Sequence, residues 1–173
     1  MSEKGPLVSV IMNCYNGEKY LREAIDSVYA QTYTNWEIIF WDNSSTDKSA
    51  EIAKSYDKKI KYFRSRENTC LGRARRQATK EAKGDYLAFL DSDDLWLDRK
   101  LEKQTDLLLN NDIAVVYGKS NIIYEDESKK EVLAYGGKLY SGMVFKELVC
   151  NNFIVFSSAI VDRRKFIECG GFP

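Results

Sequence analysis

Short apolar runs alternate with helix-periodic segments in the N-terminal part of this sequence, and this alternation restricts the fold more than any other feature. Four runs are rich in β-branched and aromatic residues, as buried strands are; they cover residues 7–15, 36–41, 60–65 and 86–90. Apolar residues between and after these runs recur at helical spacing. We expect helices over residues 18–31, from the turn at 42–49 to about 56, and over 72–82 and 99–109.

An order of strand, helix and strand with short connections is typical of parallel sheets, because parallel strands need a crossover. We therefore expect an α/β fold with a mainly parallel central sheet and helices on both faces. Ligands bind beyond the carboxyl ends of the strands in such sheets. Polar clusters directly follow three predicted strands, at Tyr15 and Asn16, at 42–47 and at 91–94. These clusters should meet at one edge, and Asn16 is also placed to cap the first helix.

The pattern is looser after residue 112. We expect one or two strands in residues 113–124, an exposed loop, and a returning strand at 131–135. A short helix is expected at 145–149 and another buried strand at 153–161. The length of 173 residues suits one domain with a real core.

Histidine is absent from the sequence, and its absence excludes several classes of chemistry. Ser-His-Asp and Cys-His nucleophilic catalysis are excluded, as is imidazole metal ligation. Catalysis must therefore use carboxylates, cations or a metal ion on oxygen ligands. The formal net charge is zero, so a broad nucleic-acid surface is not indicated and no nucleic-acid partner is expected.

The cysteines are too far apart in sequence to indicate a zinc site or a disulfide framework. We expect reduced, mostly buried thiols at Cys14, Cys70, Cys150 and Cys169. No run approaches the roughly 18 apolar residues of a membrane span, and the N-terminus lacks the features of a signal peptide. The cytoplasm is the expected location.

Three carboxylates, Asp91, Asp93 and Asp94, follow the apolar run at 86–90. Carboxylate oxygens suit Mg²⁺ and Mn²⁺, and Asp91 and Asp93 could face the same way in an extended chain. Such a site keeps positions open for water or a substrate phosphate. The alternative is that Asp93 or Asp94 only caps the helix that follows.

Three further residues have a functional and a structural interpretation each. Asp42 could accept hydrogen bonds from a base or a sugar, or could begin the turn at residues 42–45. Arg75 could pair with phosphate, to which guanidinium is geometrically matched, or could belong with its basic neighbours to a solvated helix face. Tyr15 could stack on a planar ring or fill the edge of the core.

The order of the motifs resembles that of glycosyltransferase family 2, the inverting nucleotide-sugar enzymes with a GT-A fold. The first half shares V-S-V-I with Y-N, a helix ending in S-V-x-x-Q-T-Y, and W-E-I-I followed by D-N-S-S-T-D. The A-R of GRARRQA, the A-K-G-D-Y-L and the L-D-S-D-D continue the match, and RRKFIECGGF is similar to a later stretch of the family. The resemblance covers essentially the whole chain.

The resemblance implies a nucleotide site. The family's first loop and the Asp ending its second strand hold the nucleotide, which would place Asn13, Tyr15 and Asp42 around the base and ribose. The family's A-R position matches Ala74 and Arg75, so Arg75 is expected among the residues that bind the nucleotide sugar.

The resemblance also implies a divalent metal cofactor, Mn²⁺ or Mg²⁺, at the D-x-D. Asp93 is the expected direct ligand, and Asp91 is expected near the ribose and diphosphate and to share the metal site. Asn13 and Cys14 stand where the family usually has Pro-Thr, and Trp41 stands where it often has an acidic residue. These departures concern the nucleobase preference more than the reaction class.

The catalytic base of the family is usually an Asp or Glu shortly after a G-G-F segment. Here the sequence ends at Pro173, directly after that segment, so the catalytic residue is unknown within the chain and the base is expected after Pro173. On this interpretation the chain is one GT-A-like domain, truncated at its C-terminal end. Its nucleotide-sugar-binding half covers residues 1–112, and residues 113–173 begin an acceptor-binding half.

The expected function is inverting, metal-dependent transfer of a sugar from a nucleotide-diphosphate donor to an acceptor hydroxyl. A glycan or a lipid-linked acceptor, as in polysaccharide biosynthesis, would fit, and so would peripheral association with the inner face of a membrane. Two alternatives are a non-catalytic nucleotide-sugar-binding module and a phosphatase of the haloacid dehalogenase type. The second prefers its D-x-D on the first strand, not the fourth. The donor sugar, the nucleobase and the oligomeric state stay open.

Overall fold

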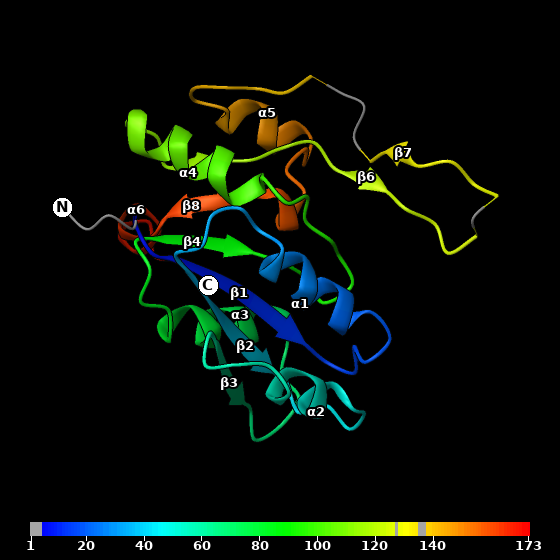
Figure 1. The fold of residues 1–173 in the computed structure, drawn as a ribbon. Coiled ribbons are helices and arrows are strands. Elements are labelled where there is room, and N and C mark those ends of the chain that lie inside the picture. Colours follow the sequence, from blue (N-terminus) through cyan, green and yellow to red (C-terminus); the bar gives the residue numbers. More distant parts are fainter. Residues whose placement is uncertain (1–4, 127, 135–137) are drawn as a thin grey trace.

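The computed structural model describes residues 5–126, 128–134 and 138–173. A six-stranded sheet in the order β3-β2-β1-β4-β8-β5 forms its centre (Figure 1). Strands β3, β2, β1 and β4 are parallel, whereas β8 is antiparallel to both β4 and β5. The predicted mainly parallel sheet is confirmed. The strand bounds are β1 Val8–Cys14, β2 Trp36–Asp42, β3 Ile60–Arg64, β4 Tyr86–Phe89, β5 Val115–Val116 and β8 Ile160–Asp162.

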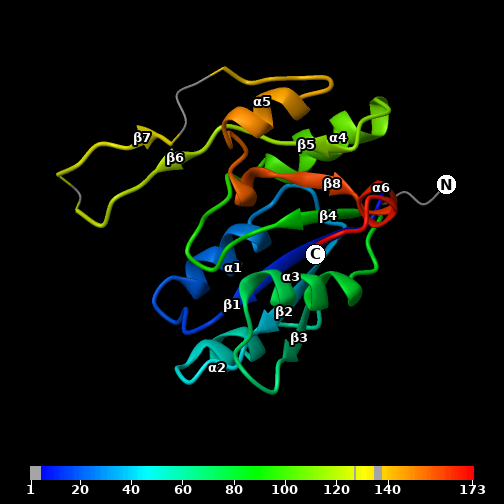
Figure 2. The ribbon, with the colours of Figure 1, turned by 180° about the vertical axis from the view of Figure 1, so that it is seen from behind.

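Both faces of the sheet are covered by helices, as expected (Figures 1 and 2). Successive side chains of a strand point to opposite faces, so Val10 and Met12 of β1 enter one core cluster and Ile11 enters the other. The first cluster includes buried residues of α1 (Leu21–Tyr29), α2 (Ser49–Lys54) and α4 (Lys100–Asn110). The second includes residues of α3 (Leu71–Lys80) and α6 (Arg163–Glu168). Burial on both faces explains why the strands are almost uniformly apolar.

The predicted helices are confirmed with bounds that differ from the expected ones: α1 and α2 are shorter, whereas α4 has the expected length and begins one residue later. The expected cap of α1 is wrong. The N-cap position of α1 is Tyr20, without a side-chain cap. Asn16 instead has a positive φ of 54°, and its Oδ1 accepts a hydrogen bond of 2.8 Å from the backbone N–H of Thr46. Asn16 thus connects the loop after β1 to the loop after β2.

The second half contains a short hairpin, a helix and the last strand. The hairpin of β6 (Asn121–Ile122) and β7 (Val132–Leu133) projects from the sheet (Figure 1), which confirms the predicted strands; residue 135 of the predicted returning strand lies outside the described residues. The predicted short helix is α5 (Phe145–Cys150).

The prediction of one continuous strand over residues 153–161 is wrong, because Phe156–Ser158 form a 3₁₀ turn, η1, and β8 begins only at Ile160. The Ser158 hydroxyl donates to the carbonyl of Val155 at 2.7 Å, a local bond that competes with pairing in a sheet.

The cysteines differ from the expectation of mostly buried thiols. Cys14 is buried, whereas Cys70, Cys150 and Cys169 are exposed. Across the described residues, every helix is too short or too polar to cross a lipid bilayer.

Candidate functional site

The loops after β1, β2 and β4 meet at the carboxyl edge of the sheet. Cys14 is in register with Asp42, and its carbonyl accepts a hydrogen bond of 2.8 Å from the N–H of Asn43. A Cβ added to Gly17 would lie only 3.0 Å from Oγ of Ser92, so the loops after β1 and β4 are in contact. The predicted convergence of the three polar clusters is confirmed.

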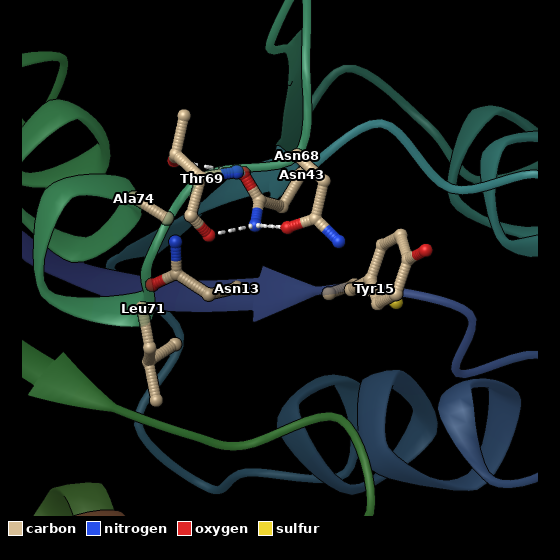
Figure 3. Close-up of a pocket in the computed structure, with 8 residues that line it drawn as sticks. Asn13, Tyr15, Asn43, Asn68, Thr69, Leu71 and Ala74 are labelled. Atoms are coloured by element: carbon tan, nitrogen blue, oxygen red, sulfur yellow. Dashed lines mark hydrogen bonds between the residues drawn. The ribbon is translucent and has the colours of Figure 1, made fainter.

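A pocket of about 230 Å³ opens at this edge (Figure 3). Two of the predicted nucleotide-binding residues, Asn13 and Tyr15, line it. The side chain of Tyr15 is 51% exposed, so the ring does not fill the core edge, and it stands free at the end of β1. The complete lining is Asn13, Cys14, Tyr15, Asn43, Asn68, Thr69, Leu71 and Ala74.

An amide network builds one wall of this pocket. Nδ2 of Asn43 donates to Oδ1 of Asn68 at 2.7 Å and to the carbonyl of Thr69 at 2.8 Å. Oδ1 of Asn43 accepts from the N–H of Thr69 at 3.2 Å. Within the described part of the chain, Nδ2 of Asn13 is buried and has no hydrogen-bond partner. The pocket therefore holds an unused donor beside ordered amides.

The sequence analysis did not identify Asn43, Asn68 or Thr69 as site residues. One signal was available for Asn43, which directly follows Asp42 at the end of a buried strand. Asn68 and Thr69 lie in the loop before α3, and only the fold brings that loop to β2.

Asp42 lies beneath the surface and not in the pocket. Its side chain is 0% exposed, and Oδ1 accepts from the N–H of Ser45 at 2.6 Å, so the turn interpretation is confirmed. Oδ2 accepts from the Tyr62 hydroxyl at 2.5 Å and from Nη1 of Arg64 at 2.7 Å. Burial and this bond to Asp42 raise the pKa of Tyr62. Whether Asp42 also contacts a base or ribose stays a prediction.

Arg75 and Asp91 form a partly buried ion pair. Nη2 of Arg75 donates to Oδ1 of Asp91 at 2.9 Å, and the two side chains are 17% and 36% exposed. The guanidinium carbon also lies 3.6 Å from the centroid of the Phe156 ring, a favourable cation–π geometry. The interpretation of Arg75 as part of a solvated helix face is therefore wrong. Burial raises the pKa of Asp91, and the charge and hydrogen bond of Arg75 partly offset this effect.

The remaining acids of the cluster have different surroundings. Asp93 is exposed, whereas Oδ2 of Asp94 accepts a hydrogen bond from Oγ of Ser157. The same Ser157 oxygen accepts from the backbone N–H of Asp91 at 3.1 Å. Ser157 thus holds the acidic loop against η1, a contact that the sequence analysis missed because the two segments are 66 residues apart.

The alternative role of Asp93 or Asp94 as a helix cap is wrong. Helix α4 begins at Lys100, and its N-cap position is Arg99 without a side-chain cap. The carboxylates of the acidic loop therefore do not cap α4.

The D-x-D residues fit a metal ion that is shared with a ligand. Among the described residues, no three acidic or thiol side chains gather as a preformed metal site. Burial is the main cause of the raised pKa of Asp91, and the negative charges of Asp94 and Asp93 add to it, so a cation at this loop would reduce the repulsion among the three carboxylates. Mg²⁺ and similar ions are commonly bound by one or two carboxylates plus water and phosphate oxygens.

The chain is similar to known sugar transferases. Residues 9–170 match the family described as Glycosyl transferase family 2. The chain is 41% identical over 118 residues to the UDP-Glc:alpha-D-GlcNAc-diphosphoundecaprenol beta-1,3-glucosyltransferase WfgD of Escherichia coli. This similarity covers 68% of the chain and 47% of the length of that relative.

Two solved structures show the same fold. TarS 1–349 of S. aureus, in complex with UDP-GlcNAc, matches with a TM-score of 0.74 and 22% identity over 94% of this chain and 47% of that chain. The mannosyltransferase PcManGT of Pyrobaculum calidifontis, in complex with GDP-Man and Mn²⁺, matches with a TM-score of 0.72 and 20% identity. This second match covers 97% of the present chain and 48% of the other. The chain thus has a GT-A-like fold and spans about half the length of these proteins.

Proposed function

We propose that this chain, which belongs to glycosyl transferase family 2, acts in the inverting, metal-dependent transfer of a sugar from a nucleotide-diphosphate donor to an acceptor hydroxyl. The observation that carries the proposal is the arrangement at the carboxyl edge of the sheet. Arg75 on α3 pairs with Asp91 in the loop after β4, which also carries the exposed Asp93. Ala74, the neighbour of Arg75 on α3, lines the pocket of Tyr15. A nucleotide diphosphate could place its base in this polar pocket beside the aromatic ring and its phosphates at the acidic loop, where a metal ion and Arg75 would supply the positive charge.

The base and ribose would occupy the pocket. Tyr15 presents an exposed ring on which a base could stack, and the unused Nδ2 of Asn13 could donate to a base carbonyl. Asp42 would act from beneath the pocket, because its oxygens already hold Ser45, Tyr62 and Arg64. The donors in the two related complexes, UDP-GlcNAc and GDP-Man, support a nucleotide-sugar ligand.

Asp93 and Asp91 would hold Mn²⁺ or Mg²⁺, which when bound neutralises the developing charge of the departing diphosphate. Arg75 keeps Asp91 in place through its hydrogen bond and adds positive charge beside the diphosphate. The Mn²⁺ in the complex of the related mannosyltransferase supports this assignment.

The acceptor hydroxyl must lose a proton during transfer, and a carboxylate is the expected general base. Its position after Pro173 stays a prediction. The name of the E. coli relative describes a diphosphoundecaprenol-linked acceptor, which favours a lipid-linked acceptor here and contact with a membrane surface.

Calorimetric titration with UDP and GDP, each with Mn²⁺ and with EDTA, tests the donor site. We expect one nucleotide to bind, and to bind more tightly with the metal. Equal affinity with Mn²⁺ and EDTA would contradict the metal dependence. Tight donor binding without transfer, in a longer protein that carries the complete domain, would favour the nucleotide-sugar-binding module instead.

A further inference from the structure

A second pocket is lined by residues of α3 and α6. Residues of both helices pack with the same core cluster of the sheet, and Figure 2 shows where the two helices lie. The volume of this pocket is about 360 Å³, and its floor includes Leu87, near the start of β4. Asp91 follows the end of the same strand, so four residues of extended chain, roughly 13 Å, separate the two positions. This second pocket is therefore distinct from the nucleotide site.

Three cationic side chains line the second pocket. Arg76 and Lys80 come from α3, and Arg163 comes from the first turn of α6; among the described residues, no acidic side chain lines the pocket. The ion pairs formed by the described residues include none of these three cations. The part of the pocket that the structure describes thus carries three positive charges and no acidic side chain in its lining.

The side chain of Arg163 also has a buried nitrogen, Nε, that donates no hydrogen bond within the described structure. Buried polar groups are rarely left unpaired. The backbone holds this residue in place, since its N–H donates to the carbonyl of Asp85 at 2.9 Å. The cap of α6 also orders this turn, because Oδ1 of Asp162 accepts from the N–H of Lys165 at 2.9 Å. These two backbone hydrogen bonds therefore hold the residue that carries the Arg163 guanidinium in place at the pocket.

Apolar side chains of α6 and of the segment after it also line the pocket. The rings of Phe166 and Phe172 pack edge to face with centroids 5.2 Å apart, and Ile167 is 56% exposed beside them. Gly171 allows this packing, because it has a positive φ of 66° and an added Cβ would lie 3.3 Å from the Phe166 ring. The pocket thus offers apolar contact area directly next to three cations.

We propose that this second pocket binds the phosphate group of an anionic lipid. The phosphate would lie against Arg76, Lys80 and Arg163, because guanidinium groups match phosphate oxygens in geometry. The glycerol and upper acyl part would lie against Phe166 and Ile167. An inorganic phosphate would make no contact with the apolar side chains of the pocket, and an apolar ligand would make no ionic contact with the three cations. This site would hold the domain at an anionic membrane surface, independently of the donor bound at the other edge.

Co-sedimentation with lipid vesicles tests the proposal. The pocket variant is Arg76→Gln with Arg163→Gln, and the matched control is Arg73→Gln with Arg164→Gln. Both remove one cation from α3 and one from α6, but the control residues do not line the pocket. We expect the wild type and the control to bind phosphatidylglycerol vesicles better than phosphatidylcholine vesicles. The pocket variant should bind the anionic vesicles at least about tenfold more weakly, since each cation at such a surface contributes severalfold.

Several outcomes would overturn the lipid assignment. An equal loss in the two variants would indicate diffuse charge attraction, and no preference for anionic vesicles would remove the basis of the proposal. Calorimetric binding of inorganic phosphate without vesicle binding would indicate a soluble phosphate ligand instead. Lys80→Gln, an exposed position on α3, gives the same test if the double variant folds poorly. Nucleotide affinity with Mn²⁺, measured on the same variants, should not change and so separates this site from the donor site.

Discussion

Arg75 donates a hydrogen bond of 2.9 Å to Asp91 and so connects α3 to the acidic loop after β4. The same guanidinium lies against Phe156, which comes from η1 late in the chain. Three segments that are distant in sequence therefore position one carboxylate. This relationship gives Asp91 a fixed position, which the D-x-D pattern alone does not.

Arg75→Lys should weaken the binding of nucleoside diphosphate with Mn²⁺ by about tenfold or more, because lysine keeps the charge but loses the planar group that both pairs and stacks. Arg75→Gln should weaken it further. Calorimetry measures both affinities. Arg73→Lys, on the exposed side of the same helix, is the control. Unchanged affinity in Arg75→Lys would show that the pair is structural only.

Asp93→Asn should abolish the difference in nucleotide affinity between Mn²⁺ and EDTA, because a neutral amide is a poor ligand for a hard cation. The fold should survive, since Asp93 is exposed, and the midpoint of thermal unfolding checks this. Asp98→Asn, an exposed position after the same loop, should keep the metal effect. A full metal effect in Asp93→Asn would exclude this residue as the ligand.

Asp42→Asn should lower the free energy of unfolding by about 1–3 kcal/mol, because the donors of Tyr62 and Arg64 lose a buried charged acceptor. This loss is smaller than that expected for a fully buried ion pair, because the Arg64 side chain is 43% exposed and water can replace part of its interaction with Asp42. Tyr62→Phe removes one donor and should cost about 1 kcal/mol. Urea denaturation measures both; a smaller loss in Asp42→Asn than in Tyr62→Phe would contradict this account.

The same Asp42 variant tests contact with the base. If Asp42 bonds the base or ribose, its substitution should weaken a nucleoside and the corresponding diphosphate by the same factor. A loss confined to the diphosphate would instead place Asp42 near the phosphates.

The stability of the protein should rise between pH 7 and pH 9 because of Lys100. Burial lowers the pKa of this amine from 10.5 to about 7. The unfolded chain therefore binds more protons than the folded chain in this window, and the free energy of unfolding increases with pH. The free energy of unfolding should increase by about 1–2 kcal/mol over this pH range, less than the pKa shift alone would give. The reason is that two groups stabilise the charged amine: the Trp96 ring, whose centroid is 4.2 Å away, and Oε1 of Gln104 at 2.6 Å.

Urea denaturation at several pH values checks the Lys100 prediction. Lys100→Met should flatten the pH dependence and be more stable than the wild type at pH 7. Lys103→Met, at an exposed position of the same helix, should behave like the wild type. A wild-type dependence that persists in Lys100→Met would assign the effect to another group.

The sequence by itself determined the type and order of the main elements and the edge at which the site lies. The pattern of apolar residues along the chain is a local property of the sequence, so the runs that form β1, β2, β3 and β4 could be identified without knowledge of the fold. The parallel-strand rule then placed Tyr15, Asp42 and Asp91 at one end of the sheet. The order of the motifs also identified the family, which the match over residues 9–170 confirms.

Only the tertiary structure decided the contacts that define the site. Ser157 reaches the acidic loop and Phe156 reaches Arg75 because β8 inserts antiparallel beside β4. No local periodicity encodes which distant strand a chain segment will join. The same reason explains why Asn16 bonds Thr46 and does not cap a helix, and why η1 interrupts a run that reads as one strand. Local sequence sets the elements, whereas side-chain partners depend on long-range packing that exists only once the sheet is assembled.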